Sequence, residues 1–230
     1  MAKKVFIGVG HGGKDPGAVG YLIEADINLE MAIACRDYLV ANGVEVKMSR
    51  TKDENDDISE EVRECNAYNP DLAVDVHNNA GGGDGFEVLH SIVGGTGKIL
   101  AQNIEAEVKK IGQNSRGCKT KKNSSGKDYY HFIRSTACPA VILEGVFVDN
   151  KADAAQADTL AEQKAFGVAY AKGILKTLGI TPVDIGDVFT DGTKDTLKRV
   201  QVGAYRNKEN ADELVKKLKA DGYDAFIVYE

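Results

Sequence analysis

Short apolar runs alternate along the chain with longer segments in which apolar side chains recur at helical spacing. The run KKVFIGVG at 3–10 is almost continuously apolar, as in a buried parallel strand, and it ends just before His11. Residues 24–41 follow with apolar positions three to four apart, and Asn42-Gly43 is a typical helix stop. The first 43 residues therefore predict a strand, a glycine-rich loop and a helix.

The same alternation continues to about residue 180. Further strands are predicted at 44–50, 71–77, 85–91 and 139–147, and further helices at 59–68, 97–112 and 160–179. The helix at 59–68 is expected to start at Ser59. Alternating strands and crossover helices predict an α/β fold, with a mostly parallel twisted sheet and helices on both faces, in one domain spanning 1–180.

The composition changes after this domain. Pro182 and several Gly and Asp residues indicate a linker over 181–195. Residues 196–230 then read as a strand, a charged amphipathic helix, a Gly turn and a second strand. Because so small a βαβ unit cannot bury a core alone, we expect it to need a partner surface.

Composition and charge exclude some classes of partner. The 230 residues carry a formal net charge of -6, and no stripe of Lys and Arg stands out, which argues against nucleic acid as a partner. No segment approaches the roughly 18 apolar residues of a membrane span, so no membrane insertion is expected. The first ten residues lack the apolar core of a secretory signal, which predicts synthesis in the cytoplasm without a signal peptide.

The four cysteines give no sign of a metal or disulfide framework. They are scattered without a CxxC pair, which favours structural or free thiols. Their positions are Cys35, Cys65, Cys118 and Cys138.

Chemistry-bearing residues gather where the predicted strands end. His11 and His77 follow two strands and Glu144 lies within a third, while Glu24 occupies the first turn of the helix after His11. Since ligands bind beyond the carboxyl ends of strands in open α/β sheets, these four side chains should converge. Two imidazoles and one carboxylate form a three-ligand zinc site with a position open to water, and a further carboxylate would serve as general base.

Each residue also has a simpler interpretation. A histidine at a strand end is often only a polar edge residue, and Glu24 alone suits a helix start. Glu144 is harder to explain, because it interrupts the apolar run AVILEGVF, where an unpaired buried carboxylate costs several kcal/mol. His90 and His131 are taken as structural, with His131 a candidate on the substrate side. The glycines around His11 lack the order of a phosphate loop and would let a bulky polymer approach the metal.

Four separated motifs carry a family resemblance. GHGGKDPGAVG with Glu24, then INLEMA, VDVHNNA and PAVILEGVFVDN, resemble the zinc-dependent N-acetylmuramoyl-L-alanine amidases with the type-3 catalytic domain, over residues 4 to about 178. The resemblance implies zinc on His11, Glu24 and His77, Glu144 as the catalytic carboxylate, and hydrolysis of bacterial peptidoglycan between the lactyl group of N-acetylmuramic acid and L-alanine. This sequence departs from the family pattern just before the second histidine: the family often has Ser and Ile there, whereas this chain has VDVH. Asp75 should face the same side as His77 and act as its partner.

The tail resembles one repeat of the sporulation-related, peptidoglycan-binding (SPOR) module, which usually contains two repeats. We hypothesise a homodimer in which two half-modules cover each other's exposed sheet edge. A wall hydrolase without an export signal would be either a phage endolysin released through a holin-type pore or a sporulation autolysin released by mother-cell lysis.

Two other functions remain open on the residues alone. One is a zinc peptidase that cuts the stem peptide itself, and the other is a non-catalytic cell-wall-binding protein with the same fold. The presence of all four site residues disfavours the non-catalytic alternative, and the resemblance favours the amidase over the peptidase.

Overall fold

The computed structural model describes residues 2–183 and 214–218. The chain divides into two units, Met1–Gly192 and Thr193–Glu230. In the second unit the described residues, 214–218, are helical and fall in the predicted amphipathic helix. The linker beyond residue 183 and the rest of the predicted βαβ unit lie outside the described residues, so these boundaries stay predictions.

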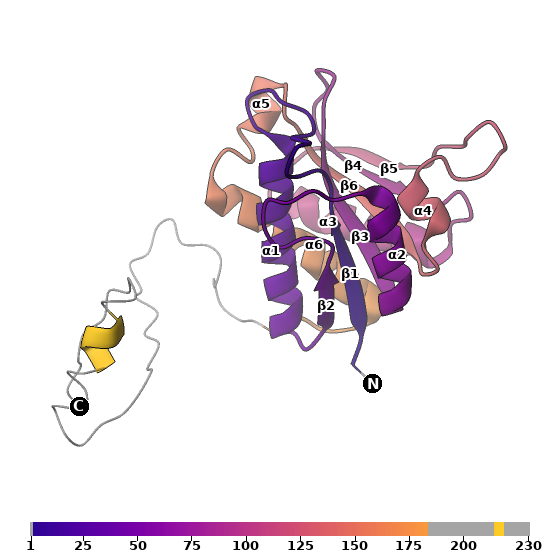
Figure 1. Ribbon diagram of the computed structural model, residues 1–230. Coiled ribbons are helices and arrows are strands. Elements are labelled where there is room, and N and C mark those ends of the chain that lie inside the picture. The colour runs from indigo at the N-terminus through magenta and orange to yellow at the C-terminus, as the bar shows by residue number, and fades with distance from the viewer. Residues whose placement is uncertain (1, 184–213, 219–230) are drawn as a thin grey trace. The chain divides into compact units, whose positions relative to one another are not determined.

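The first unit is built on a six-stranded sheet with the order β2-β1-β3-β6-β4-β5 (Figure 1). The strands are β1 (Lys4–Val9), β2 (Glu45–Met48), β3 (Leu72–Asn79), β4 (Phe86–His90), β5 (Ser115–Lys119) and β6 (Ala140–Phe147). All neighbouring strands are parallel except β4 and β6, which are antiparallel. The prediction of a mostly parallel α/β sheet is confirmed.

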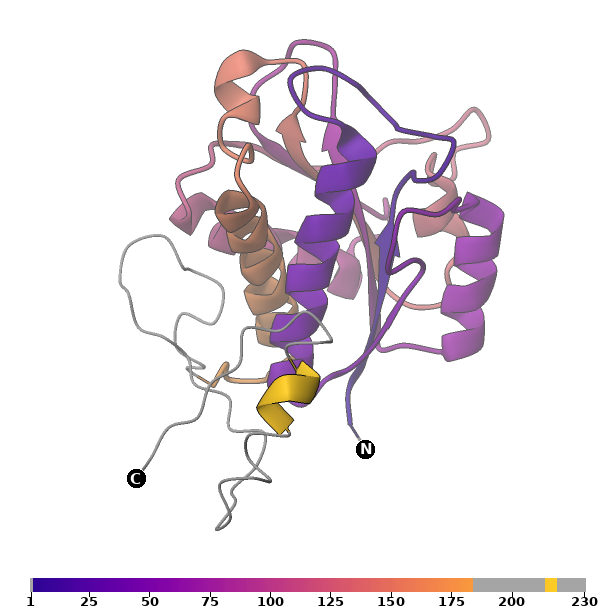
Figure 2. The ribbon, with the colours of Figure 1, turned by 60° about the vertical axis from the view of Figure 1, so that its left-hand side comes forward.

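Helices cover both faces of this sheet, as the alternating pattern predicts. The helices are α1 (Glu24–Ala41), α2 (Ile58–Tyr68), α3 (Gly95–Lys110), α4 (His131–Ser135), α5 (Lys151–Ala154) and α6 (Leu160–Leu178). Figure 2 shows α1 and α6 on one side of the sheet and α2 on the other. Alternate residues of β1 serve the two faces: Val5 and Ile7 pack in the core under α1, α3 and α6, whereas Phe6 packs in the core under α2 and α4.

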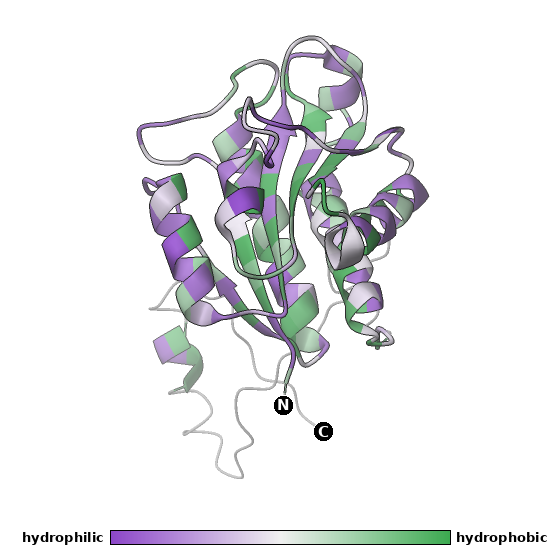
Figure 3. Cartoon of the chain, turned by 90° about the vertical axis from the view of Figure 1, so that its right-hand side faces the viewer, coloured by the Kyte–Doolittle hydropathy of each residue, from purple (hydrophilic) through white to green (hydrophobic). Residues whose placement is uncertain are grey.

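The four inner strands β1, β3, β6 and β4 are mostly buried, and Figure 3 shows hydrophobic colour along strands of the sheet. Burial on both faces explains why they read as continuous apolar runs. Polar side chains interrupt these apolar runs at a few positions, among them Asp75 and His77 in β3, Glu144 in β6 and Glu87 in β4.

Helix α6 fixes α1 against the sheet through close backbone contact. A Cβ at Gly167 would overlap the carbonyl oxygen of Met31 in α1, and one at Gly173 would lie 2.5 Å from the Cα of Ile104 in α3. Glycine at these positions lets α6 pack tightly between the two helices. The packing sets the position of the first turn of α1, where Glu24 lies.

Helix ends follow local signals, with one correction. The predicted start of α2 at Ser59 is wrong by one residue, because the Asp57 side chain accepts the backbone N–H groups of Ser59 and Glu60 and begins the helix at Ile58. The end of α6 agrees with the prediction: Gly179 adopts a left-handed conformation with φ of 72°.

Three short elements have no counterpart in the predicted set. Strand β5, at one edge of the sheet, has the sequence SRGCK, which lacks apolar alternation. Helices α4 and α5 contain five and four residues, too few for helical periodicity to be detected.

Candidate metal centre

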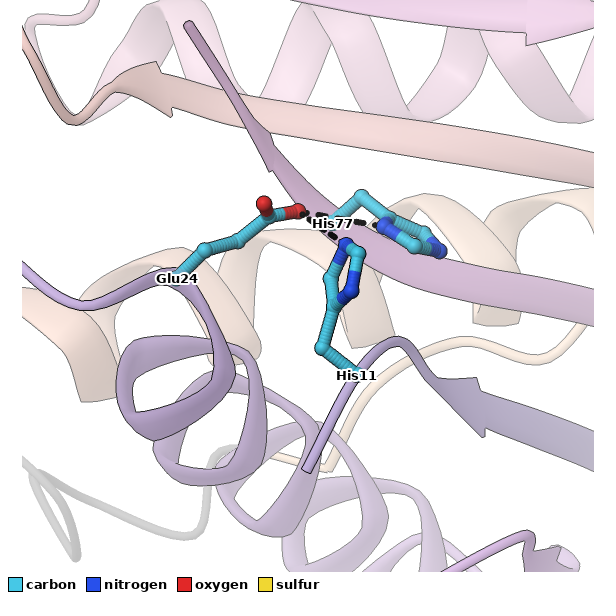
Figure 4. Close-up of side chains that lie close together, drawn as sticks. All are labelled: His11, Glu24 and His77. Atoms are coloured by element: carbon cyan, nitrogen blue, oxygen red, sulfur yellow. Dashed lines mark hydrogen bonds and ion pairs between the residues drawn. The ribbon is translucent and has the colours of Figure 1, made fainter. Parts of the chain in front are cut away.

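Three side chains from separate elements converge beyond the carboxyl ends of β1 and β3. His11 follows β1, Glu24 is the first residue of α1, and His77 lies near the end of β3. One ligand atom from each lies within 4.8 Å of the other two. Figure 4 shows the three side chains pointing toward one another. The structure thus brings together the three predicted metal ligands.

The Glu24 carboxylate is the centre of this cluster. Its Oε1 lies 3.3 Å from His11 Nε2 and 3.1 Å from His77 Nδ1, and it accepts the Asn78 N–H at 3.1 Å. Its Oε2 accepts the Ala18 N–H at 2.9 Å. Glu24 is only 4% exposed, so these contacts hold it in one orientation.

The electrostatics favour a bound cation. Burial raises the pKa of Glu24, but the hydrogen bonds with His11 and His77 outweigh this effect and leave the pKa well below its usual range. The hydrogen bond to Glu24 raises the pKa of His11. An ionised, buried carboxylate oxygen beside two imidazole nitrogens is the N, N, O donor set of a catalytic zinc site, so the residues present fit a divalent metal.

The backbone conformation of His11 and a contact with Asp15 orient its ring toward Glu24. His11 has a φ of 64°, which non-glycine residues seldom adopt. Its Nδ1 lies 2.9 Å from Asp15 Oδ2, which leaves Nε2 directed toward Glu24. Asp15 therefore fixes the ring in the orientation that a ligand needs.

Two glycines make room for the ligands themselves. A Cβ at Gly10 would overlap the His77 ring, and one at Gly17 would lie 2.6 Å from Glu24 Oε2 and 2.7 Å from His11 Cδ2. At these positions the missing side chain accommodates ligand side chains. This role adds to the expected one, and the expectation that the glycines let a bulky polymer approach stays a prediction.

Asp75 contacts His77 on the side away from Glu24. Its Oδ2 lies 3.3 Å from His77 Nε2, and Asp75 is almost fully buried. Burial lowers the pKa of His77, but Asp75 and Glu24 raise it well above its usual range. As expected from alternation along β3, Asp75 and His77 share a face, and His77 has a carboxylate at each ring nitrogen.

Glu144 lies beside His77 in the sheet. The two residues are register partners in β3 and β6, so their side chains leave the same face. Burial raises the pKa of Glu144 to about 7, and the carboxylates of Glu24, Asp75 and Glu87 act in the same direction while His77 opposes them. A carboxyl group with this pKa can accept and return a proton near neutral pH.

Two buried amides connect the elements behind the centre. Asn28 donates to the Gly10 carbonyl at 2.9 Å and accepts from the Asn78 amide at 2.8 Å. Asn78 Oδ1 in turn accepts the Val146 N–H at 2.8 Å. Neither residue was predicted from the sequence, although Asn28 follows Glu24 by one helical turn and therefore lies on the same face of α1.

Arg50 is a third residue that the sequence pattern did not reveal. It is 2% exposed, and its guanidinium donates to the carbonyl oxygens of Val9, Gly10 and Ala25 at 2.8–3.2 Å. These bonds fix the end of β1 to the first turn of α1. Nothing in the sequence around Arg50 distinguishes it from an exposed strand-end arginine.

The remaining histidines lie outside the donor cluster. His90 is buried and its Nδ1 lies 2.9 Å from the Ser91 carbonyl oxygen. His131 is exposed, with Nδ1 3.3 Å from an Arg134 amino group. All four cysteines are free thiols, in agreement with the prediction. No helix among the described residues is long and apolar enough to cross a membrane.

A His–Glu–His cluster with a neighbouring carboxyl group of raised pKa, at the strand ends of an α/β sheet, is an arrangement typical of metal-dependent hydrolases. The chain belongs to the N-acetylmuramoyl-L-alanine amidase family, whose model matches residues 5–176. The SPOR domain model matches residues 175–230, which begins earlier than the predicted tail at 196. Both resemblances drawn from the motifs are confirmed.

Named relatives agree with this assignment. The chain is 32% identical over 231 residues to the N-acetylmuramoyl-L-alanine amidase CwlM of Bacillus licheniformis, covering 98% of this chain and 85% of the relative. It is 32% identical over 230 residues to a sporulation-specific amidase of Bacillus subtilis, covering 98% and 84%. It is 35% identical over 192 residues to an endolysin of Bacillus phage SPP1, covering 78% and 68%.

Solved structures share the fold. Cwp6 from Clostridium difficile superposes with a TM-score of 0.76 and 34% identity, over 77% of this chain and 30% of that one. The catalytic domain of CwlV from Bacillus (Paenibacillus) polymyxa gives a TM-score of 0.70 and 27% identity, over 78% and 99%. The protein is thus a peptidoglycan amidase, and neither the peptidase nor the non-catalytic alternative is supported.

Proposed function

We propose that the chain is a zinc-dependent N-acetylmuramoyl-L-alanine amidase in which His11, Glu24 and His77 hold the metal and Glu144 is the catalytic carboxylate. The observation that carries the proposal is the placement of Glu24 Oε1 between two imidazole nitrogens, 3.3 Å and 3.1 Å away. Glu144 then lies next to His77 with a pKa of about 7.

The protein residues divide the chemistry between them. When bound, the metal would polarise the scissile carbonyl and lower the pKa of a coordinated water. Glu144 takes a proton from the attacking water and returns it to the departing alanine nitrogen. Burial keeps its pKa near the working pH, where both transfers are feasible. Asp15 and Asp75 hold the two imidazoles in the orientations that direct one ring nitrogen of each toward Glu24.

Metal removal and restoration test this proposal. Protein dialysed against a chelator should lose peptidoglycan hydrolysis, and one equivalent of zinc should restore it, with metal content measured by plasma mass spectrometry. Glu144→Gln should bind zinc as the wild type does and lose activity by a factor of 10² or more. Full activity after verified metal removal, or in Glu144→Gln, would contradict the assignment.

We also infer that residues 196–230 form the wall-binding or dimerising part of the protein after a linker at 181–195. Support comes from the match of the SPOR domain model to residues 175–230. Co-sedimentation of Glu144→Gln protein with insoluble peptidoglycan, with and without residues 181–230, tests wall binding. Analytical ultracentrifugation at micromolar concentration tests the homodimer, and a monomer would exclude it.

The biological setting is proposed from relatives. We infer that the chain acts on the wall after synthesis in the cytoplasm, as a sporulation autolysin or a phage endolysin. The sporulation-specific relative matches 98% of this chain and the endolysin 78%, which favours the autolysin. Reporter fusions to the native promoter would separate expression late in sporulation from expression during phage induction.

A further inference from the structure

A second charged cluster lies beside Glu144, on the side opposite His77. Glu87 in β4 is the register partner of Glu144 in β6, so both side chains leave the same face of the sheet. The Glu87 carboxylate pairs with Arg116 through Nε and with Lys119, whose Nζ lies 2.9 Å away. Two cations face the Glu87 carboxylate, so Glu87 by itself neutralises only one of them.

The cations are available to a ligand although Glu87 is not. The Glu87 side chain is 11% exposed, whereas those of Arg116 and Lys119 are 40% and 39% exposed. The Arg116 guanidinium also lies over the Phe147 ring, 5.1 Å from its centroid, which fixes its plane. Within residues 2–183 its hydrogen bonds use Nε alone, so both terminal amino groups remain for a planar anion.

Strand pairing explains how the cluster forms. The register between β4 and β5 shifts after Phe86, so that Glu87 pairs with Gly117 instead of Arg116. The irregularity lets Arg116 reach Glu87 despite the alternation along β5. A Cβ at Gly117 would contact nothing within 4 Å, so no neighbouring group covers this position.

The distances suit a group on the stem peptide. Adjacent strands lie about 4.8 Å apart, so the cations of β5, which reach back to Glu87 in β4, lie about 5–10 Å beyond Glu144. Glu144 returns its proton to the leaving nitrogen, so the released peptide extends on the Glu144 side, away from His11 and Glu24. Two extended residues span about 7 Å, which places the second stem residue over the cluster.

We propose that Arg116 and Lys119, oriented by Glu87, bind a free carboxylate on the second residue of the stem peptide. This inference rests on the proposed function, because it uses the role of Glu144 to orient the substrate. In a stem peptide whose second residue is D-glutamate linked through its side chain, the α-carboxylate is free, and amidation to D-isoglutamine removes the charge. The cluster would thus distinguish walls whose second stem residue is D-glutamate from walls in which that residue is D-isoglutamine.

Two matched substrates test the assignment. Linear, uncrosslinked peptidoglycan is polymerised in vitro with either D-glutamate or D-isoglutamine as the second stem residue, and kcat/KM is measured on each with zinc-loaded full-length protein. Wild type should prefer the free carboxylate by about five- to tenfold, as expected for charge-assisted hydrogen bonds at a partly exposed site. Arg116→Gln, Lys119→Gln and the double variant should progressively abolish the preference.

The ratio of kcat/KM on the D-glutamate polymer to that on the D-isoglutamine polymer separates loss of carboxylate recognition from structural damage. A fold defect or a changed Glu144 pKa lowers both rates alike and leaves the ratio intact. Lys119→Arg should retain most of the preference, and Lys110→Gln, which removes a cation on α3 across the sheet, should retain all of it.

Each outcome decides a different point. Equal rates on both polymers in wild type, or an unchanged ratio in the double variant, would overturn the carboxylate site while leaving the amidase assignment intact. Weaker adsorption to intact walls with an unchanged ratio would assign the cations to wall phosphates instead. Failure of wild type to cleave either polymer would contradict the proposed function itself.

Discussion

Replacing Glu144 with Gln should abolish activity and stabilise the metal-free protein at the same time. Gln has nearly the same shape as Glu but cannot ionise. Burial and the neighbouring carboxylates raise the pKa of Glu144 from 4.5 to about 7 in the folded protein. For a group whose pKa rises on folding, the stabilising contribution is complete below the unfolded value and is lost as pH rises through the folded value.

The magnitude follows from this shift. At about 1.36 kcal/mol per pKa unit, the ionised Glu144 side chain costs wild type up to about 3 kcal/mol of unfolding free energy above pH 7. Only part of that cost is present at pH 5. The stability advantage of Glu144→Gln should therefore widen by about 2 kcal/mol between pH 5 and pH 8.

Urea denaturation of chelator-treated wild type and Glu144→Gln at pH 5, 6.5 and 8 measures this difference. Glu60→Gln is the control, because Glu60 is exposed and its carboxylate keeps contact with water. The difference in unfolding free energy between Glu60→Gln and wild type should not grow comparably between pH 5 and pH 8. A constant difference between wild type and Glu144→Gln across the three pH values would refute the account of how burial sets the proton affinity of Glu144.

Three further predictions concern the metal centre and the helix that positions it. His77→Ala should reduce bound zinc to trace amounts in dialysed protein, measured by plasma mass spectrometry; stoichiometric zinc would remove His77 from the ligand set. Asp75→Asn should weaken zinc affinity about 10- to 100-fold in competition with a chromophoric chelator, because His77 loses a charged partner, and unchanged affinity would assign Asp75 a purely structural role. Gly167→Ala should lower the free energy of unfolding by about 1–3 kcal/mol in urea, since its Cβ would overlap the Met31 carbonyl; wild-type stability would show that α6 can shift away from α1.

The sequence predicts the convergence of His11, Glu24 and His77 because two simple rules suffice. Continuous apolar runs locate the parallel strands, and parallel strands present their carboxyl ends at one edge. His11 and His77 end such runs, and Glu24 begins the following helix, so their convergence follows from topology. The capping error at Ser59 has no effect on this result, since α2 contributes no ligand.

The charged cluster beside Glu144 could not be predicted in the same way. Its existence depends on β4 entering the sheet antiparallel between β6 and β5, which places Glu87 opposite Glu144. Neither strand order nor register is encoded in the local pattern of β4. Strand β5, which supplies both cations, has no apolar alternation at all.

The partners of buried polar side chains are also beyond what the sequence pattern can predict. Among residues 2–183, Arg50 donates only to backbone carbonyls, and such contacts depend on where β1 ends relative to α1. Asn28 and Asn78 pair across 50 positions of sequence. A sequence pattern identifies which residues are polar within an apolar environment, but the partner appears only when the elements have been packed.

Mass spectrometry of the fragments released from purified peptidoglycan tests the central claim most directly. The wild-type protein, with zinc and then with a chelator, is compared with Glu144→Gln. We expect stem peptides that begin at a free L-alanine amine, released only by zinc-loaded wild type. Cuts within the stem peptide, or the same release by Glu144→Gln, would contradict it.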